Sequence, residues 1–126
     1  MTGIVYDAGV LVAADRNQRT VWADHRVRLE AGIVPVVPAA VVAQVSRSPT
    51  QAQLRRLLRG CEVVSLTEQR AHAAGHLLGR AGSADVVDAV VAQTAAGLRA
   101  DVVTGDRADI RRLLDAAGAS CQIIDV

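Results

Sequence analysis

The stretch Ile4-Val5-Tyr6-Asp7 is a short apolar run that ends in a carboxylate. The same arrangement returns far along the chain as Val102-Val103-Thr104-Gly105-Asp106. Each run is typical of a buried strand that hands over to a helix. In an open parallel α/β sheet the carboxyl ends of such strands lie along one edge, and ligands bind at that edge. We therefore expect Asp7 and Asp106 to lie close together in the folded chain.

Strand-like and helix-like patterns alternate from one end of the chain to the other. The strand patterns cover residues 3–7, 33–37, 61–66, 101–104 and 121–125. The helical patterns cover residues 9–15, 20–31, 38–46, 51–59, 67–80, 84–97 and 106–117. This alternation predicts a three-layer α/β/α fold with a central parallel sheet, formed by a single domain over residues 1–126.

Composition narrows the class of protein further. Hydrophobic residues make up 51% of the chain, which is too large a share for a disordered protein. No apolar run reaches the roughly 18 residues of a membrane span, and no signal peptide pattern precedes the first strand, so we expect a cytoplasmic protein. Cys61 and Cys121 could form a disulfide, but reduced thiols are the favoured interpretation in a cytosolic chain.

All 14 basic residues are arginines. The lack of lysine disfavours a P-loop and a receiver-type phosphorylation site, because both need one. Guanidinium groups suit phosphate recognition, although codon bias in a GC-rich genome explains the all-arginine set more simply. For the basic run at residues 55–59, we favour the solvated face of an amphipathic helix over contact with phosphates.

Several acidic residues stand where a predicted strand ends or a predicted helix begins. They are Asp7, Asp85, Asp88, Asp106 and Asp109. Clustered carboxylates repel one another unless a cation neutralises them, and divalent cations are the usual partner. Each residue also has a simpler interpretation. A first-turn role is equally plausible for Asp85 or Asp88 alone, behind Ser83 as the expected helix cap, and Asp106 alone could cap its helix.

Within this acidic set, the sequence indicates a functional role most strongly for Asp7 and least strongly for Asp109. Asp7 follows a buried strand, and the sequence suggests no capping partner for it. Asp109 lies three residues after Asp106, on the same side of the predicted helix. It is either an outer ligand or a solvated acid, and the solvated acid is slightly favoured.

Four stretches of the chain resemble motifs of PIN domains, specifically of the VapC-type toxins of bacterial toxin–antitoxin systems. They cover residues 4–7, 37–47, 85–92 and 102–106. The second resembles the second motif of the family, the third resembles its acidic helix start, and the fourth resembles its signature of strand, Thr, any residue and Asp. Each motif is weak alone, but their order and spacing make the resemblance fairly specific.

The resemblance implies a metal-dependent endoribonuclease that hydrolyses RNA phosphodiester bonds as the toxin of a toxin–antitoxin pair. It implies Mg²⁺ or Mn²⁺ as the cofactor, with Asp7, Asp88 and Asp106 as the catalytic and metal-binding residues. Asp85 and Asp109 are expected to support them. The implied partners are the RNA substrate, a small cognate antitoxin and a second copy of the chain in a homodimer.

The sequence departs from the family pattern at two positions. Gln44 stands where the second motif normally supplies a Glu, and Gly9 stands where many relatives carry Ser or Thr. Gln cannot act as a base, although its carbonyl oxygen can still support a metal-bound water. Two hypotheses remain: an active nuclease, or a catalytically weakened PIN domain that binds RNA or a protein partner without cleavage.

Overall fold

The computed structural model describes residues 3–126, in which five strands alternate with seven helices. The strands are β1 (Ile4–Tyr6), β2 (Val36–Pro38), β3 (Glu62–Val64), β4 (Asp101–Thr104) and β5 (Ile123–Asp125). The helices are α1 (Ala8–Asp15), α2 (Arg19–Glu30), α3 (Ala39–Val45), α4 (Ala52–Arg59), α5 (Glu68–Ala81), α6 (Val86–Leu98) and α7 (Arg107–Ala116). Every strand and helix expected from the sequence is present.

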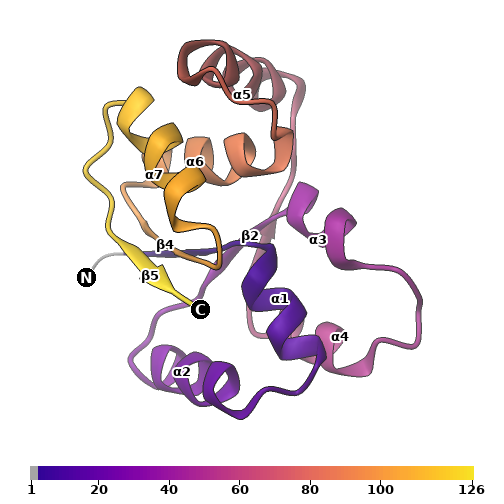
Figure 1. Cartoon of the computed structure of the whole chain (residues 1–126). Helices are drawn as coiled ribbons and strands as arrows, with labels where there is room; N and C mark the ends of the chain where they lie inside the picture. Colours follow the sequence, from indigo (N-terminus) through magenta and orange to yellow (C-terminus); the bar gives the residue numbers. More distant parts are fainter. Residues whose placement is uncertain (1–2) are drawn as a thin grey trace.

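The strands form one parallel sheet in the order β3-β2-β1-β4-β5 (Figure 1). The chain runs outward from β1 through β2 to β3, and then returns to the other side of β1 as β4. The strand order therefore reverses between β1 and β4, where Val5 pairs with Val102. The carboxyl ends of the strands at such a reversal are the usual place for a ligand site.

Helices cover both faces of this sheet. Helices α5, α6 and α7 pack against one another on one face, while α1, α2 and α4 lie on the other (Figure 1). Helix α3 contacts both α1 and α6. The three-layer α/β/α fold predicted from the sequence is thus confirmed. The core is built mainly from small aliphatic side chains, and Tyr6 is the largest of the fully buried ones.

The helix starts lie one or two residues from their predicted positions, and at α6 and α3 the reason for the difference is clear. Helix α6 begins at Val86, because Asp85 caps it: the Asp88 N–H donates to Asp85 Oδ1 at 3.0 Å. Ser83 does not cap the helix, and its Oγ accepts instead from the Asp85 N–H at 3.4 Å. Pro38 ends β2, paired in register with Val64, and α3 starts one residue later.

Neither a membrane span nor a disulfide is found among residues 3–126. No helix there is long and apolar enough to cross a membrane. Cys61 and Cys121 are free thiols, as expected. Burial raises the pKa of Cys61 to about 12, which keeps this thiol protonated and unreactive at neutral pH.

Candidate metal centre

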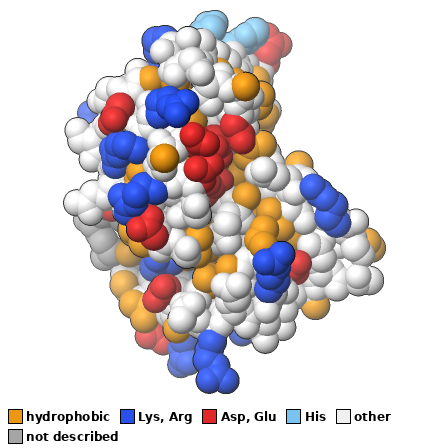
Figure 2. Space-filling model, viewed as in Figure 1, with side chains coloured by type: hydrophobic (Ala, Val, Ile, Leu, Met, Phe, Trp, Pro, Cys, Tyr) orange, Lys and Arg blue, Asp and Glu red, His pale blue; other side chains and the backbone are white. Residues whose placement is uncertain are grey.

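A cavity of about 290 Å³ lies at the carboxyl ends of β1 and β4. Its lining comes from four separate parts of the chain. The lining residues are Asp7, Ala8, Gly9, Gln44, Asp85, Asp88, Gly105 and Asp106. Figure 2 shows acidic side chains gathered near the centre of this face of the molecule, with basic side chains on either side. We call this site the acidic cavity.

Asp7 is held in place by hydrogen bonds to both of its carboxylate oxygens. Its Oδ1 accepts from the Ala8 N–H at 2.7 Å, so Asp7 caps α1, a role that the sequence did not suggest. Its Oδ2 accepts from the Thr104 hydroxyl at 2.6 Å. Because the side chain is only 4% exposed, these contacts fix the direction of the carboxylate toward the cavity.

Thr104 is the residue at this site whose role the sequence did not reveal. It is fully buried at the end of β4, and its Oγ1 also accepts from the Asp106 N–H at 2.9 Å. One hydroxyl therefore ties Asp7 to the start of α7. Two signals in the sequence marked the position: a polar side chain at the end of an apolar strand, and the Thr of the motif that residues 102–106 resemble.

Asp88 offers the clearest candidate ligand atom of the site. It lies in the first turn of α6, its side chain is 6% exposed, and its Oδ2 has no hydrogen-bond partner within residues 3–126. Burial, followed by the charges of Asp7 and Asp85 and then of two more acids, raises the pKa of Asp88 to about 7. A buried, unpaired carboxylate oxygen is costly unless a proton or a cation neutralises it.

Asp106 and Asp109 bring two further carboxylates to Asp88. One oxygen from each of the three groups lies within 4.8 Å of the others. Burial and the neighbouring Asp109 raise the pKa of Asp106. Asp109 follows one turn later on α7, is 44% exposed and pairs with Arg112 at 3.8 Å. The structure thus places its carboxylate beside the cluster while leaving it partly solvated.

Asp85 and Gln44 complete the predicted set. Asp85 lines the cavity from the start of α6, where its hydrogen bond caps the helix. Gln44 lines the cavity from α3 and is exposed. The position that supplies a Glu in the resembling motif therefore faces the acids with a neutral amide, and it adds no negative charge to them.

Gly9 has a structural reason to lack a side chain. A Cβ at this position would lie 3.1 Å from the Gly105 amide nitrogen and 3.1 Å from Cγ1 of Val126. Val126 is held there because its N–H donates to the Thr104 carbonyl oxygen at 3.1 Å. A hydroxyl-bearing residue at position 9 would therefore require the Gly105 backbone and the Val126 side chain to move by a few tenths of an ångström.

The residues of the acidic cavity fit a hard divalent cation. Mg²⁺ and Mn²⁺ prefer oxygen ligands, and the site offers several carboxylates that repel one another. The unpaired Oδ2 of Asp88 is the clearest free ligand atom. Asp7 and Asp106 can supply the others from the ends of two adjacent strands.

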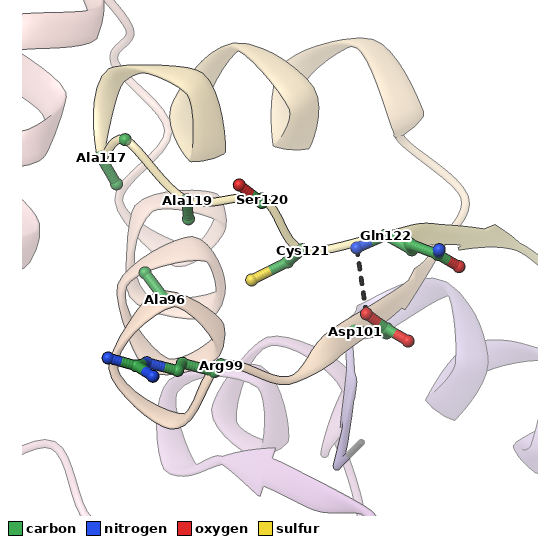
Figure 3. Close-up of a pocket in the computed structure, with 9 residues that line it drawn as sticks. Ala96, Arg99, Asp101, Ala117, Ala119, Ser120, Cys121 and Gln122 are labelled. Carbon is green, nitrogen blue, oxygen red and sulfur yellow. Dashed lines mark hydrogen bonds between the residues drawn. The ribbon is translucent and has the colours of Figure 1, made fainter. Parts of the chain in front are cut away.

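A larger cavity, of about 570 Å³, lies at the opposite end of β4 and β5 (Figure 3). The C-terminal end of α6 and the loop after α7 form its walls. Its carboxylate, Asp101, already accepts a hydrogen bond from the Gln122 N–H at 3.0 Å. The larger cavity therefore lacks the convergent, unpaired acids that mark the smaller one.

The fold and site together define a class: a three-layer α/β/α protein with a carboxylate cluster at the reversal point of a parallel sheet. A profile of the PIN domain family matches residues 4–114. The chain therefore belongs to the PIN domain family, whose members are generally nucleases that use divalent metals. A search of curated proteins finds no significant match.

Solved structures with a similar fold include several toxin–antitoxin complexes. VapBC2 from Rickettsia felis, bound to a promoter DNA fragment, matches with a TM-score of 0.72 and 15% identity over 98% of both chains. DNA-bound VapBC from Salmonella typhimurium matches with a TM-score of 0.69 and 17% identity over 99% of this chain and 98% of the other. A toxin–antitoxin complex from Klebsiella pneumoniae matches with a TM-score of 0.66 and 16% identity over 85% of this chain and 89% of the other. Because the sequence identities are this low, the likeness establishes the fold alone.

Proposed function

We propose that this PIN domain is a metal-dependent endoribonuclease that acts as the toxin of a toxin–antitoxin pair. The observation that carries the proposal is the acidic cavity, where Asp88 keeps a buried carboxylate oxygen without a partner in the described part of the chain. The toxin role is supported by the toxin–antitoxin complexes among the structures of similar fold.

In this proposal Asp7, Asp88 and Asp106 hold Mg²⁺ or Mn²⁺, and Asp85 and Asp109 add negative charge around them. When bound, the ion supplies the activation of a water and the neutralisation of charge that builds on the phosphate. The hydrogen bonds from Thr104 and from the Ala8 N–H hold the Asp7 carboxylate in one orientation before RNA arrives. Such preorganisation avoids a cost of rearrangement during the reaction.

The alternative is a catalytically weakened PIN domain that binds RNA or a protein without cleavage. Gln44 favours this alternative, because it lines the acidic cavity with a neutral side chain. Its amide oxygen can accept a hydrogen bond from a water, but it cannot take up that water's proton. The loss of one carboxylate also weakens the attraction for a cation.

One cleavage experiment separates these hypotheses. Purified protein is incubated with structured RNA in Mg²⁺, in Mn²⁺ and in EDTA, and the products are resolved on a denaturing gel. We expect cleavage with the metals, none in EDTA, and a loss of about 100-fold or more in Asp7→Asn. Gln44→Glu should cleave faster, because it restores a carboxylate to the cavity.

Asp115→Asn is the matched control, because Asp115 is an exposed acid on α7 that pairs with Arg111 outside the cavity. It should cleave like the unmodified protein. Cleavage that survives in Asp7→Asn, or that appears only in Gln44→Glu, would refute a native active nuclease and favour the weakened domain.

The proposed partners follow from the same cavity. A small antitoxin could neutralise the carboxylates by placing an Arg or Lys among them. A homodimer is the proposed assembly. A short neighbouring gene for a DNA-binding protein, together with co-purification of its product, would support the antitoxin partner. Sedimentation of the isolated chain would measure whether it forms a homodimer.

A further inference from the structure

A second groove, of about 500 Å³, lies between α2 and α4. Its lining residues are Arg19, Trp22, Ala23, His25, Arg26, Leu29, Arg56 and Gly60. We call it the α2–α4 groove. Trp22 Nε1 donates to the Ala14 carbonyl oxygen near the C-terminal end of α1, whereas Asp7 caps the other end. The eight-residue α1, roughly 12 Å long, therefore separates this groove from the acidic cavity.

His25 lines this groove although its side chain is only 4% exposed. Its Nε2 lies 3.1 Å from the position that a Cβ would take at Gly60, so the glycine leaves room in front of the ring. Nδ1 is hydrogen-bonded to the Tyr6 hydroxyl at 2.8 Å, which leaves Nε2 as the ring nitrogen on the Gly60 side. Nε2 is therefore the polar atom that His25 offers to the groove.

The hydrogen-bond chain behind His25 decides what that nitrogen offers. Arg28 can only donate, and its Nη1 donates to the Tyr6 hydroxyl oxygen at 3.1 Å. We assign the hydroxyl proton of Tyr6 to the bond with His25 Nδ1, because Nδ1 is an acceptor within hydrogen-bond distance of that hydroxyl and Arg28 is not. Burial and the charge of Arg28 lower the pKa of His25, so the ring stays neutral. The neutral ring carries its remaining proton on Nε2, which is therefore a donor toward the groove.

The rim of the groove is positively charged. Helices α2 and α4 carry arginines at positions 19, 26, 28, 55, 56 and 59, against acids at 24 and 30 only. Arg26 pairs with Glu30 at 3.0 Å, whereas Arg19 and Arg56 have no acidic partner within 4.0 Å among the described residues. Figure 2 shows basic side chains gathered at the lower end of the molecule, where Figure 1 places α2.

The wall of the groove is apolar and aromatic. Trp22 and Leu29 line it, and the guanidinium of Arg56 lies 4.2 Å from the centre of the Trp22 ring. A flat ring can stack on an aromatic side chain or on a guanidinium plane. Arg56 Nη1 also donates to Gln53 Oε1 at 3.1 Å, but neither Arg56 nor Arg19 has an acidic partner within residues 3–126. Arginines without an acidic partner beside such a wall match a ligand that joins an anion to a flat ring, which a nucleotide does and an acidic side chain does not.

We propose that the α2–α4 groove binds one nucleotide of single-stranded RNA, with its phosphate against Arg19 and Arg56 and its base against Trp22 and Leu29. The His25 Nε2–H donates to an oxygen of the same nucleotide. The inference rests on the proposed function, since the bound strand would be the substrate whose other end reaches the acidic cavity. It assigns the nucleotide contact to a surface that carries none of the carboxylates.

Trp22 makes the groove directly observable, because it is the only tryptophan of the chain. Its fluorescence is followed while a short single-stranded RNA is added in EDTA, which prevents metal-dependent cleavage. We expect the RNA to change the fluorescence saturably. In Arg19→Gln/Arg56→Gln, affinity should fall about 10-fold or more, and the slope of the logarithm of the binding constant against the logarithm of the salt concentration should flatten by about 0.7, because the contact to one phosphate is lost.

Arg55→Gln is the matched control, because Arg55 neighbours Arg56 on α4 but does not line the groove. It should bind RNA like the unmodified protein. Adenosine monophosphate and polyglutamate are titrated in parallel. RNA is expected to bind more tightly than the mononucleotide, and polyglutamate is expected not to bind.

Three outcomes would overturn the proposal: no fluorescence change with RNA, undiminished affinity in the double variant, or a response to polyglutamate without one to RNA. Equal affinity for RNA and the mononucleotide would overturn the assignment to a strand. Cleavage is measured separately with Mg²⁺ and Asp7→Asn. A protein that does not cleave RNA but still changes its Trp22 fluorescence with RNA would refute the nuclease function and support the RNA site in the α2–α4 groove. A protein that cleaves RNA without this fluorescence change would support the nuclease function and refute the RNA site.

Discussion

Thr104 shows how much of the acidic cavity depends on a residue that carries no charge. Its hydroxyl donates to Asp7 Oδ2 and accepts from the Asp106 N–H, and it is fully buried. Two acids that are far apart in the sequence are thus oriented by one side chain. Asp88, by contrast, is left without a partner for its Oδ2 within residues 3–126. One residue orders the site, and the other keeps an oxygen free for a cation.

Replacing Thr104 with Val should test this ordering role. Thr104→Val keeps the shape of the side chain but removes the hydroxyl, which leaves a buried Asp7 oxygen and the Asp106 N–H unpaired. We expect the free energy of unfolding to fall by about 1–3 kcal/mol and Mg²⁺ affinity to fall about 10-fold or more. Urea unfolding and calorimetric Mg²⁺ titration measure the two effects.

Thr94→Val is the control, because the Thr94 hydroxyl donates to the Val90 carbonyl oxygen at 2.7 Å on α6, outside the acidic cavity. It should leave Mg²⁺ affinity unchanged. If both variants bound Mg²⁺ equally well, Thr104 would have no ordering role at the cavity.

At the scale of elements, the acidic cavity is formed where the N-termini of three helices lie close together. Helices α1, α6 and α7 all begin there, with Asp7, Asp85 and Asp106 at their N-cap positions. The positive ends of helix dipoles lower the cost of gathering carboxylates, although they do not remove it. The start of α1 also lies so close to Gly105 and Val126 that position 9 has no room for a Cβ without movement.

A pair of glycine substitutions tests this close approach. Gly75→Ala on α5 adds a Cβ into open space and should stabilise the protein by about 0.5–1 kcal/mol, because alanine is the better helix former. Gly9→Ala should lose that gain or destabilise, and Val126→Ala in the same chain should recover part of the loss. Thermal unfolding of these three variants and of the unmodified protein measures the differences. An equal gain at both glycines would show that the approach at Gly9 imposes no restraint.

At the scale of the whole molecule, the acidic cavity sets how stability depends on pH and metal. The pKa of Asp88 is about 7 in the folded chain and 3.8 in its ordinary state, so the folded chain binds this proton more tightly. The stabilisation of the folded chain by this proton is complete below pH 3.8 and is lost as the pH rises toward about 7. A cation would replace the proton above that range.

The difference in the free energy of unfolding between the unmodified protein and Asp88→Asn isolates the contribution of the Asp88 proton. In EDTA the free energy of unfolding of the unmodified protein should fall, relative to that of Asp88→Asn, by up to a few kcal/mol as the pH rises from about 4 to about 7. Mg²⁺ at pH 8 should restore stability to the unmodified protein alone. Chemical unfolding across pH measures both. A difference that grew in the opposite direction would contradict the raised pKa of Asp88.

Much of the architecture was predictable because it follows from local patterns. Apolar runs and helical spacing predicted every strand and helix, and the alternation predicted the parallel sheet. Element ends were less predictable, because local capping competes with pairing. Asp85 rather than Ser83 caps α6, and Pro38 completes β2 instead of opening α3.

The sequence by itself determined the order of the elements and the positions of the acids, because both depend on residue type and spacing along the chain. Only the tertiary structure decided how Thr104 joins Asp7 to Asp106, why Gly9 has no side chain, and that Asp88 keeps an unpaired oxygen. It also brought Trp22, His25 and Arg56 to one groove. The reason is physical: burial and hydrogen bonding join residues across the sheet, and no local pattern records those distances.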